Sequence, residues 1–231
     1  MELLNDKLKG RIQGDIVDRL LHDDYDSAIS NISGILRHLH DNIPDDKRIS
    51  YGIVHTIKIL SEHLYNRFID TDAPVFRIAS GIFDRSSDSS VKGVALGILS
   101  YYGLSDYKAV LPYFEAAAAS SDWELREHTQ MFFRKLIKKH PDEMKKYLLK
   151  LSKSKDANLR RFVAETLRPV QENRWFYKQP EYSLSILRMM FTESAEYPRT
   201  SVGNNLSDLA RRLPDMVYKL VAELVASGTK N

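Results

Sequence analysis

Four cationic side chains recur at nearly constant spacing along the chain. They hold matching places in four segments with the form of helix starts, at steps of 34, 34 and 39 residues: Lys92, Arg126, Arg160 and Arg199. Lysine and arginine neutralise phosphate groups, so a cation that recurs on one surface indicates a polyanion, of which duplex nucleic acid is the commonest extended kind. The spacing therefore predicts a row of phosphate contacts.

A second group combines aromatic and cationic side chains. Three consecutive aromatic residues lie in a proline-bounded linker with a cation on each side: Arg174, Trp175, Phe176, Tyr177 and Lys178. Aromatic rings stack on bases or wedge between them, and the flanking cations suit phosphates. The alternative is that the rings fill the core between repeats. Because such residues favour extended structure, we expect a small β-hairpin or extended loop near residues 169–180.

Charge is distributed unevenly along the chain. Residues 1–125 carry 13 basic and 19 acidic side chains (net −6), residues 126–161 carry 12 and 4 (net +8), and residues 162–231 carry 9 and 8 (net +1). The basic block includes Lys135, Lys138 and Lys139. One interpretation is a solvated helix face. The other is a phosphate-binding surface, since the block lies inside the repeats and an acidic half beside it would orient the protein on a polyanion.

The elements that must position these side chains are helices. Apolar residues recur at spacings of three and four, strand-like alternation is nearly absent, and periods near 34 residues are typical of solenoids built from helix pairs. We therefore predict an all-α fold, a curved solenoid (α-α superhelix) of antiparallel helix pairs. It should form one domain over residues 1–231, with less regular repeats over 1–87 and regular repeats over 88–231.

Local signals predict where the helices begin and end. The segment Ser121-Asp122-Trp123-Glu124 has the form of a capping box, which predicts a helix start at about Asp122. Asp156 and Ser90 are the expected caps of the matching helices. Proline disrupts a helix interior, so we expect all eight prolines at helix ends: Pro44, Pro74, Pro112, Pro141, Pro169, Pro180, Pro198 and Pro214.

Composition excludes several classes of function. The chain has 43% hydrophobic and 28% charged residues and no cysteine, so it is globular and uses neither disulfides nor thiolate chemistry. The seven histidines lack metal-ligand spacing and no phosphate-binding glycine loop is present, so we expect neither a metal nor another cofactor. We see no signal peptide and no membrane-length apolar run. We expect a soluble, cytoplasmic protein.

The repeat pattern, with Ser-Asp-Trp-Glu-Leu-Arg-Glu in one unit and Asn-Leu-Arg-Arg in the next, resembles the HEAT-like-repeat DNA alkylation-repair proteins of the AlkD type. The resemblance covers most of the chain and is strongest from about Ser90 onward. It implies HEAT-like helix pairs that hold duplex DNA on a basic concave face. The glycosylases of this family excise N3- and N7-alkylated purines with two tryptophans, a carboxylate and an arginine.

The resemblance assigns these roles residue by residue. The first tryptophan corresponds to Trp123, the carboxylate to Glu127 one helical turn later, and the arginine to Arg161. The second tryptophan corresponds to Asn204, and Glu127 stands where active members have aspartate. Structural alternatives remain for two of these positions: Trp123 would belong to the core, and Glu127 would pair with an arginine of the next repeat.

These departures decide the functional expectation. A carboxylate stabilises positive charge on the sugar only when its position is correct to within about an ångström. An aromatic ring beside a cationic base contributes about 0.5–2 kcal/mol. We therefore expect a DNA-binding protein that recognises branched or distorted DNA without base excision, similar to the AlkF/AlkG-type subgroup. That subgroup carries an extra hairpin, for which the aromatic segment is the candidate. The alternatives are an active alkylpurine glycosylase and a protein-binding scaffold.

Overall fold

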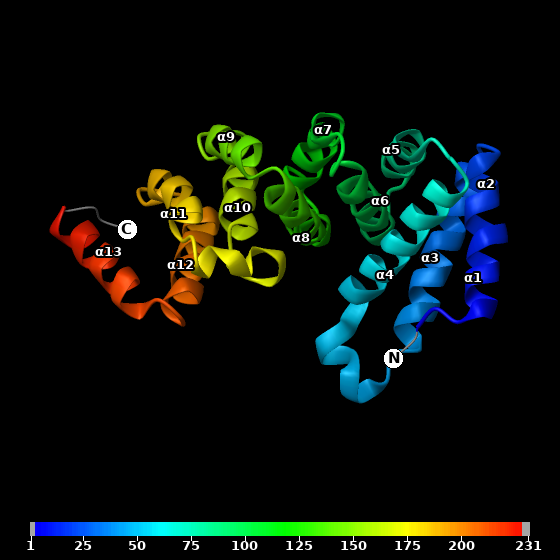
Figure 1. Ribbon diagram of the computed structural model, residues 1–231, viewed down its shortest axis with the longest axis horizontal. Helices are drawn as coiled ribbons and strands as arrows, with labels where there is room; N and C mark the ends of the chain where they lie inside the picture. The colour runs from blue at the N-terminus through cyan, green and yellow to red at the C-terminus, as the bar shows by residue number, and fades with distance from the viewer. Residues whose placement is uncertain (1–2, 228–231) are drawn as a thin grey trace. The chain divides into compact units, whose positions relative to one another are not determined.

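The computed structural model describes residues 3–227, apart from the side chains of residues 49–51. Over this range the chain consists of helices joined by short turns and contains no strand (Figure 1). The predicted all-α class is confirmed. The chain forms two compact units, one of residues up to 117 with 122–132 and the other of residues 118–121 with 133 onward. The single-domain organisation stays a prediction.

The first unit contains the N-terminal helices. These are α1 (Asp6–Ile12), the π-helix η1 (Gln13–Val17), α2 (Asp18–Leu21), α3 (Tyr25–Asp41), the 3₁₀-helix η2 (Asp45–Lys47), α4 (Arg48–Asp70), α5 (Val75–Arg85), α6 (Ser89–Tyr102), α7 (Tyr107–Ala118) and the start of α8 (Trp123–Lys139). α4 packs closely against α6 at Gly97 of α6, where an added Cβ would overlap the hydroxyl of Ser61 of α4. Only glycine permits this approach without a shift.

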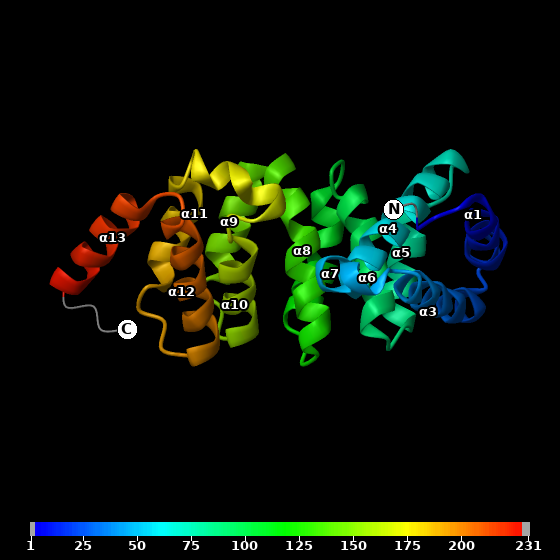
Figure 2. The same ribbon diagram turned by 90° about the horizontal axis from the view of Figure 1, so that it is seen from below.

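The second unit contains the rest of α8 and the C-terminal helices. These are α9 (Pro141–Leu151), α10 (Ala157–Thr166), the 3₁₀-helix η3 (Gln171–Tyr177), α11 (Glu181–Leu187), the 3₁₀-helix η4 (Arg188–Met190), α12 (Glu196–Ala210) and α13 (Pro214–Ala226). α10 and α12 lie side by side in both views (Figures 1 and 2). The core of this unit also contains the fully buried Phe133 and the nearly buried Phe162, whose ring centroids lie 5.1 Å apart.

Three helix starts repeat one turn. The side chains of Asp88, Asp122 and Asp156, spaced 34 residues apart, each accept a hydrogen bond from a backbone N–H in the first turn of α6, α8 and α10. The predicted helix start at about Asp122 and the predicted cap Asp156 are confirmed; Asp122 accepts from the N–H of Glu124, the role that a capping box gives to Ser121. The prediction at Ser90 is wrong by two residues, because Asp88 accepts from the N–H of Ser90. A carboxylate caps as well as a hydroxyl and also favours the positive end of the helix dipole.

One proline departs from its expected place. Pro112 lies inside α7 rather than at a helix end. Its ring removes one backbone hydrogen bond from the helix. The helix continues because Val110, Phe114 and Ala117 on its buried face are fully enclosed in the core. Tertiary packing outweighs the local preference here.

The segment between α10 and α11 contains neither a hairpin nor an extended loop. It forms η3, a 3₁₀-helix whose C-cap is Lys178. Phe176 is fully buried, and its ring stacks on Tyr182 of α11 at a centroid distance of 5.2 Å. Burial of this ring selects the helical turn over the extended structure that aromatic residues favour locally.

Candidate nucleic-acid interface

The four recurring cations hold one structural position. Each is the fourth residue after the N-cap of α6, α8, α10 or α12, and its backbone N–H donates to the carbonyl oxygen of that cap residue, at distances of 2.9 to 3.3 Å: Lys92, Arg126, Arg160 and Arg199. The extra residues in the last step lie between α10 and α12, where η3 is inserted. The repeat inferred from sequence is therefore a repeat of helix starts.

The four cations have equivalent backbone positions, but their side chains have different contacts and different exposure. The ammonium of Lys92 lies 4.8 Å from the ring centroid of Phe83, and Arg126 is half-buried. Arg199 is exposed. Arg160 is held by a carboxylate, because its Nε and Nη2 donate to Glu193 at 2.6 and 3.0 Å. The four side chains predicted to contact phosphates therefore differ in how freely they could reach a phosphate.

Arg160 has a structural task in this arrangement. Its Nη1 donates to the carbonyl oxygens of Ser154 and Lys155 at 2.8 and 3.1 Å. Its partner Glu193 also accepts from the N–H of Ala195, the N-cap of α12, at 2.9 Å. The guanidinium thus joins the turn before α10 to the turn before α12. The hydrogen bond from Arg160 lowers the pKa of Glu193.

Trp123 and Glu127 lie on α8 in the first unit. Trp123 is the first residue of the helix and is 63% exposed, so it is not a core residue. Glu127 follows one turn later and is half-buried; one carboxylate oxygen accepts a hydrogen bond from the side-chain amide of Gln130. The two side chains share one side of α8. An exposed aromatic ring and a carboxylate therefore lie next to each other on the surface of α8.

Arg161 and Asn204 lie in the second unit. The guanidinium of Arg161 is 3.9 Å from Glu165 on the same helix and 4.5 Å from the ring centroid of Tyr197 on α12, and the side chain is only 11% exposed. Asn204 is exposed on α12. Its neighbour Asn205 is buried and donates to the carbonyl oxygen of Ala164 at 2.6 Å. Asn205 therefore bridges α10 and α12. The joining of Trp123, Glu127 and Arg161 in one site stays a prediction.

The aromatic segment divides between core and surface. Phe176 is fully buried, so its ring cannot contact a base in this structure and instead fills the core. Trp175 packs on Phe176 and on Tyr182 at centroid distances of 4.4 and 5.0 Å. The hydroxyl of Tyr177 donates to the carbonyl oxygen of Asp208 at 3.2 Å. The flanking cations are exposed, namely Arg174 and Lys178.

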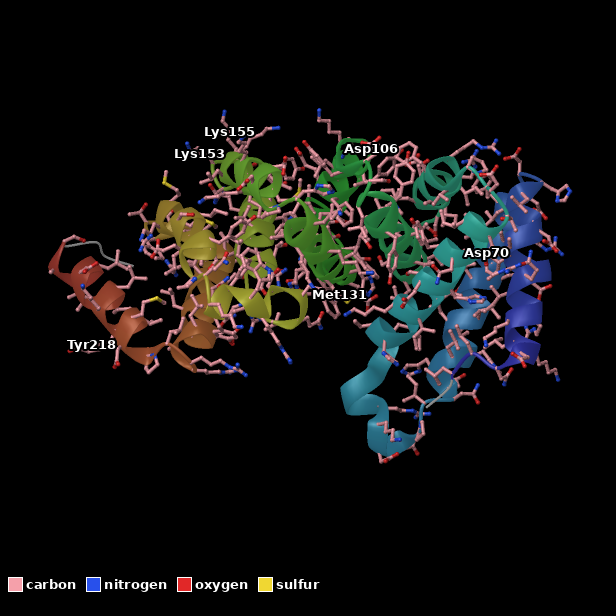
Figure 3. All side chains as sticks on the ribbon, in the orientation of Figure 1. Asp70, Asp106, Met131, Lys153, Lys155 and Tyr218 are labelled. Carbon is pink, nitrogen blue, oxygen red and sulfur yellow. The ribbon has the colours of Figure 1, made fainter. Side chains whose placement is uncertain are left out.

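The lysines of the basic block lie on several elements of the second unit. Lys138 and Lys139 are exposed at the end of α8, where cations also stabilise the negative end of the helix dipole, and Lys135 is half-buried. Lys153 and Lys155 project from the turn between α9 and α10 (Figure 3). Lys138 and Trp175 line one surface groove, together with Pro141, Asp142, Gln179 and Tyr182. Two predicted DNA-binding residues from distant parts of the sequence thus share a surface.

Sequence reasoning missed two arginines next to Arg161. Arg168 and Arg211 flank the buried carboxylate of Asp208, at 2.7 and 3.4 Å. Neither occupies the repeated position after an N-cap, so the 34-residue period could not find them. The one available signal is local, because Arg161, Glu165 and Arg168 have the four- and three-residue spacings of side-chain pairs on a helix, although Arg168 lies just beyond the end of α10.

Other classes of site find no support in the described part of the chain. Within residues 3–227 no group of three or more histidine, aspartate or glutamate side chains could hold a metal ion. None of the helices described there is long and apolar enough to cross a membrane.

Comparison with known proteins gives matches of fold. No protein-family model and no curated protein sequence matches the chain. Among solved structures, smu.31 of Streptococcus mutans UA159 has a TM-score of 0.57 at 20% identity, covering 72% of this chain and 89% of that one. AlkD2 of Streptococcus mutans has a TM-score of 0.60 at 19% identity, with coverages of 83% and 89%.

A third structure is the alkylpurine DNA glycosylase AlkC of Pseudomonas fluorescens bound to DNA containing an abasic-site analogue. Its TM-score is 0.57 at 18% identity, and the match covers 91% of this chain but 58% of AlkC. The three likenesses show that this chain has the helical-repeat fold of the AlkD and AlkC proteins, as the sequence resemblance predicted.

Proposed function

We propose that this chain, which has the AlkD-type fold, is a DNA-binding protein related to the alkylpurine DNA glycosylases. It binds the phosphate backbone through cations of α8, α10 and α12 and does not excise a base. The observation that carries the proposal is Trp123, a large aromatic side chain left 63% exposed at a helix start, one turn before Glu127. An exposed ring of this size indicates a contact surface.

Two observations support binding without excision. The carboxylate of Glu127 accepts a hydrogen bond from Gln130, which holds it back toward its own helix. The position that matches the second tryptophan is Asn204, an exposed amide that offers no aromatic face to a cationic base. The preference for branched or distorted DNA rests on the sequence resemblance alone, since the segment equated with an extra hairpin is the 3₁₀-helix η3.

Active excision is the second candidate, and the placement of Trp123 and Glu127 on one side of α8 favours it. One protein preparation tests both functions. Binding is measured to a plain duplex and to a four-way junction of equal length, and methylated DNA is incubated in parallel and assayed for released 3-methyladenine and 7-methylguanine. We expect salt-dependent binding, tighter for the junction, and no released base.

A matched pair of variants makes the outcome specific. Glu127→Gln removes the candidate carboxylate, and Glu124→Gln makes the same change at an exposed position one turn earlier. Base release that is lost in Glu127→Gln and kept in Glu124→Gln would establish the glycosylase and overturn binding without excision. Absence of binding to either DNA at low salt would overturn the DNA-binding function and leave a protein-binding scaffold.

A further inference from the structure

Five charged side chains of α10, α12 and the residues that follow their C-terminal ends form a ladder of alternating charge. In order they are Arg161, Glu165, Arg168, Asp208 and Arg211. Successive charged groups lie 3.9, 3.4, 2.7 and 3.4 Å apart, and each carboxylate lies between two guanidiniums. All five side chains belong to the second unit.

The two carboxylates of the ladder are buried and the arginines become more exposed along it. The side chains of Glu165 and Asp208 are 6% and 5% exposed, whereas those of Arg161, Arg168 and Arg211 are 11%, 31% and 76% exposed. Two negative charges are therefore enclosed between three positive charges that increasingly face solvent. The ladder has a net charge of +1, and its solvent-exposed groups are the guanidiniums of Arg168 and Arg211.

Neighbouring contacts hold the first and the fourth member of the ladder. The guanidinium of Arg161 lies over the ring of Tyr197 at 4.5 Å. The backbone carbonyl of Asp208 accepts the Tyr177 hydroxyl at 3.2 Å, which ties η3 to α12. A guanidinium held between two carboxylates, as that of Arg168 is, loses less conformational entropy when it binds a ligand than a free arginine does.

We propose that Arg168 and Arg211 are phosphate-contacting residues, and that the buried carboxylates Glu165 and Asp208 are positioning residues that hold them. The inference rests on the proposed DNA-binding function and extends its surface beyond the repeated cations. Arg168 follows the C-terminal end of α10 and Arg211 is the C-cap of α12, so both guanidiniums extend from helix ends beside Asp208.

A purely electrostatic role of Asp208 makes the opposite prediction for one variant. If Asp208 only contributes charge, Asp208→Asn removes a negative charge beside DNA and should tighten binding. If Asp208 positions Arg168 and Arg211, the same variant should weaken binding in spite of the more favourable net charge. The direction of the change in affinity therefore separates the two accounts.

The experiment measures the affinity of the full chain for a duplex as a function of salt. Arg211→Ala should weaken binding about three- to tenfold and lower the slope of log affinity against log salt by about 0.9, the value for one lost phosphate contact. Arg211 is 76% exposed, so this variant should fold normally. Lys219→Ala makes the same charge change at an exposed residue of α13 and should leave the slope unchanged.

Asp208→Asn is measured in the same series, with its thermal melt as a control for folding. Weaker binding by a folded Asp208→Asn protein, together with a reduced slope for Arg211→Ala, supports the proposal. A wild-type slope for Arg211→Ala, or tighter binding by Asp208→Asn, overturns it while wild-type binding stays intact. Failure of the proposed function differs from both, because the wild-type protein would then not bind the duplex at all.

Discussion

Trp123 and Trp175 are the two tryptophans of the chain, and they lie in opposite surroundings. Trp123 is 63% exposed at the start of α8. Trp175 packs on Phe176 and Tyr182, and its indole N–H is buried without a hydrogen-bond partner. The residue type is the same, so only the neighbours decide which ring can meet a ligand.

A pair of substitutions tests this difference. Trp123→Ala should change the free energy of unfolding by less than about 0.5 kcal/mol and weaken DNA binding by about 1–3 kcal/mol. Trp175→Ala should destabilise the fold by about 3 kcal/mol, because it removes a packed ring. Denaturant unfolding and DNA titration measure both effects. A large stability loss in Trp123→Ala would show that this ring belongs to the core.

The Arg160–Glu193 pair makes a prediction about pH. Arg160→Ala should lower the free energy of unfolding by about 2–3 kcal/mol at pH 7, because it leaves Glu193 enclosed without its partner. The pair lowers the pKa of Glu193 below its ordinary 4.5, so its contribution is present above about pH 4.5 and is lost as the pH falls through the lowered pKa.

Unfolding of the wild type, Arg160→Ala and Glu193→Gln at several pH values measures this contribution. The difference between wild type and Glu193→Gln should shrink toward acid pH. A difference that stays constant from pH 7 to pH 3 would contradict the ion pair as its source.

At the scale of elements, the repeated unit is the start of α6, α8 and α10. Ser86 and Ser154 each accept, through the side-chain oxygen, a hydrogen bond from the N–H of the capping aspartate two residues later, at 3.1 Å. That aspartate then caps the helix. The turn and its cap recur because each of these helices needs an acceptor for the backbone N–H groups of its first turn.

Removing one cap should weaken one helix start. Asp156→Ala should cost about 1 kcal/mol, since the first-turn N–H groups of α10 lose their acceptor. Asp84→Ala is the matched control, an exposed aspartate near the end of α5, and should stay within about 0.5 kcal/mol of the wild type. Equal costs for the two variants in thermal unfolding would argue against capping by Asp156.

At the scale of the whole molecule, the sequence divides into an acidic and a basic part. Residues 1–125 have a net charge of −6, whereas residues 126–231 have a net charge of +9. A polyanion should therefore meet the basic part and avoid the acidic part, whatever its base sequence.

Lysine acetylation with and without DNA tests this division. Bound DNA should slow the acetylation of Lys138, Lys139 and Lys178 about threefold or more and leave Lys7 and Lys47 unchanged. All five are exposed in the free protein, so differences in their protection would report DNA contact. Mass spectrometry measures each site, and protection of Lys47 as strong as that of Lys138 would place DNA elsewhere.

The sequence by itself determined the helical class, the 34-residue period, the start of α8 near Asp122 and the cap at Asp156. These features depend on contacts within a few residues, which local spacing records directly. Only the tertiary structure decided the state of single side chains. It placed Phe176 in the core, joined Arg160 to Glu193, and brought Arg168 and Arg211 to one carboxylate. These partners lie 33 to 40 residues apart or depend on a neighbouring helix, so burial and pairing arise only when the helices pack.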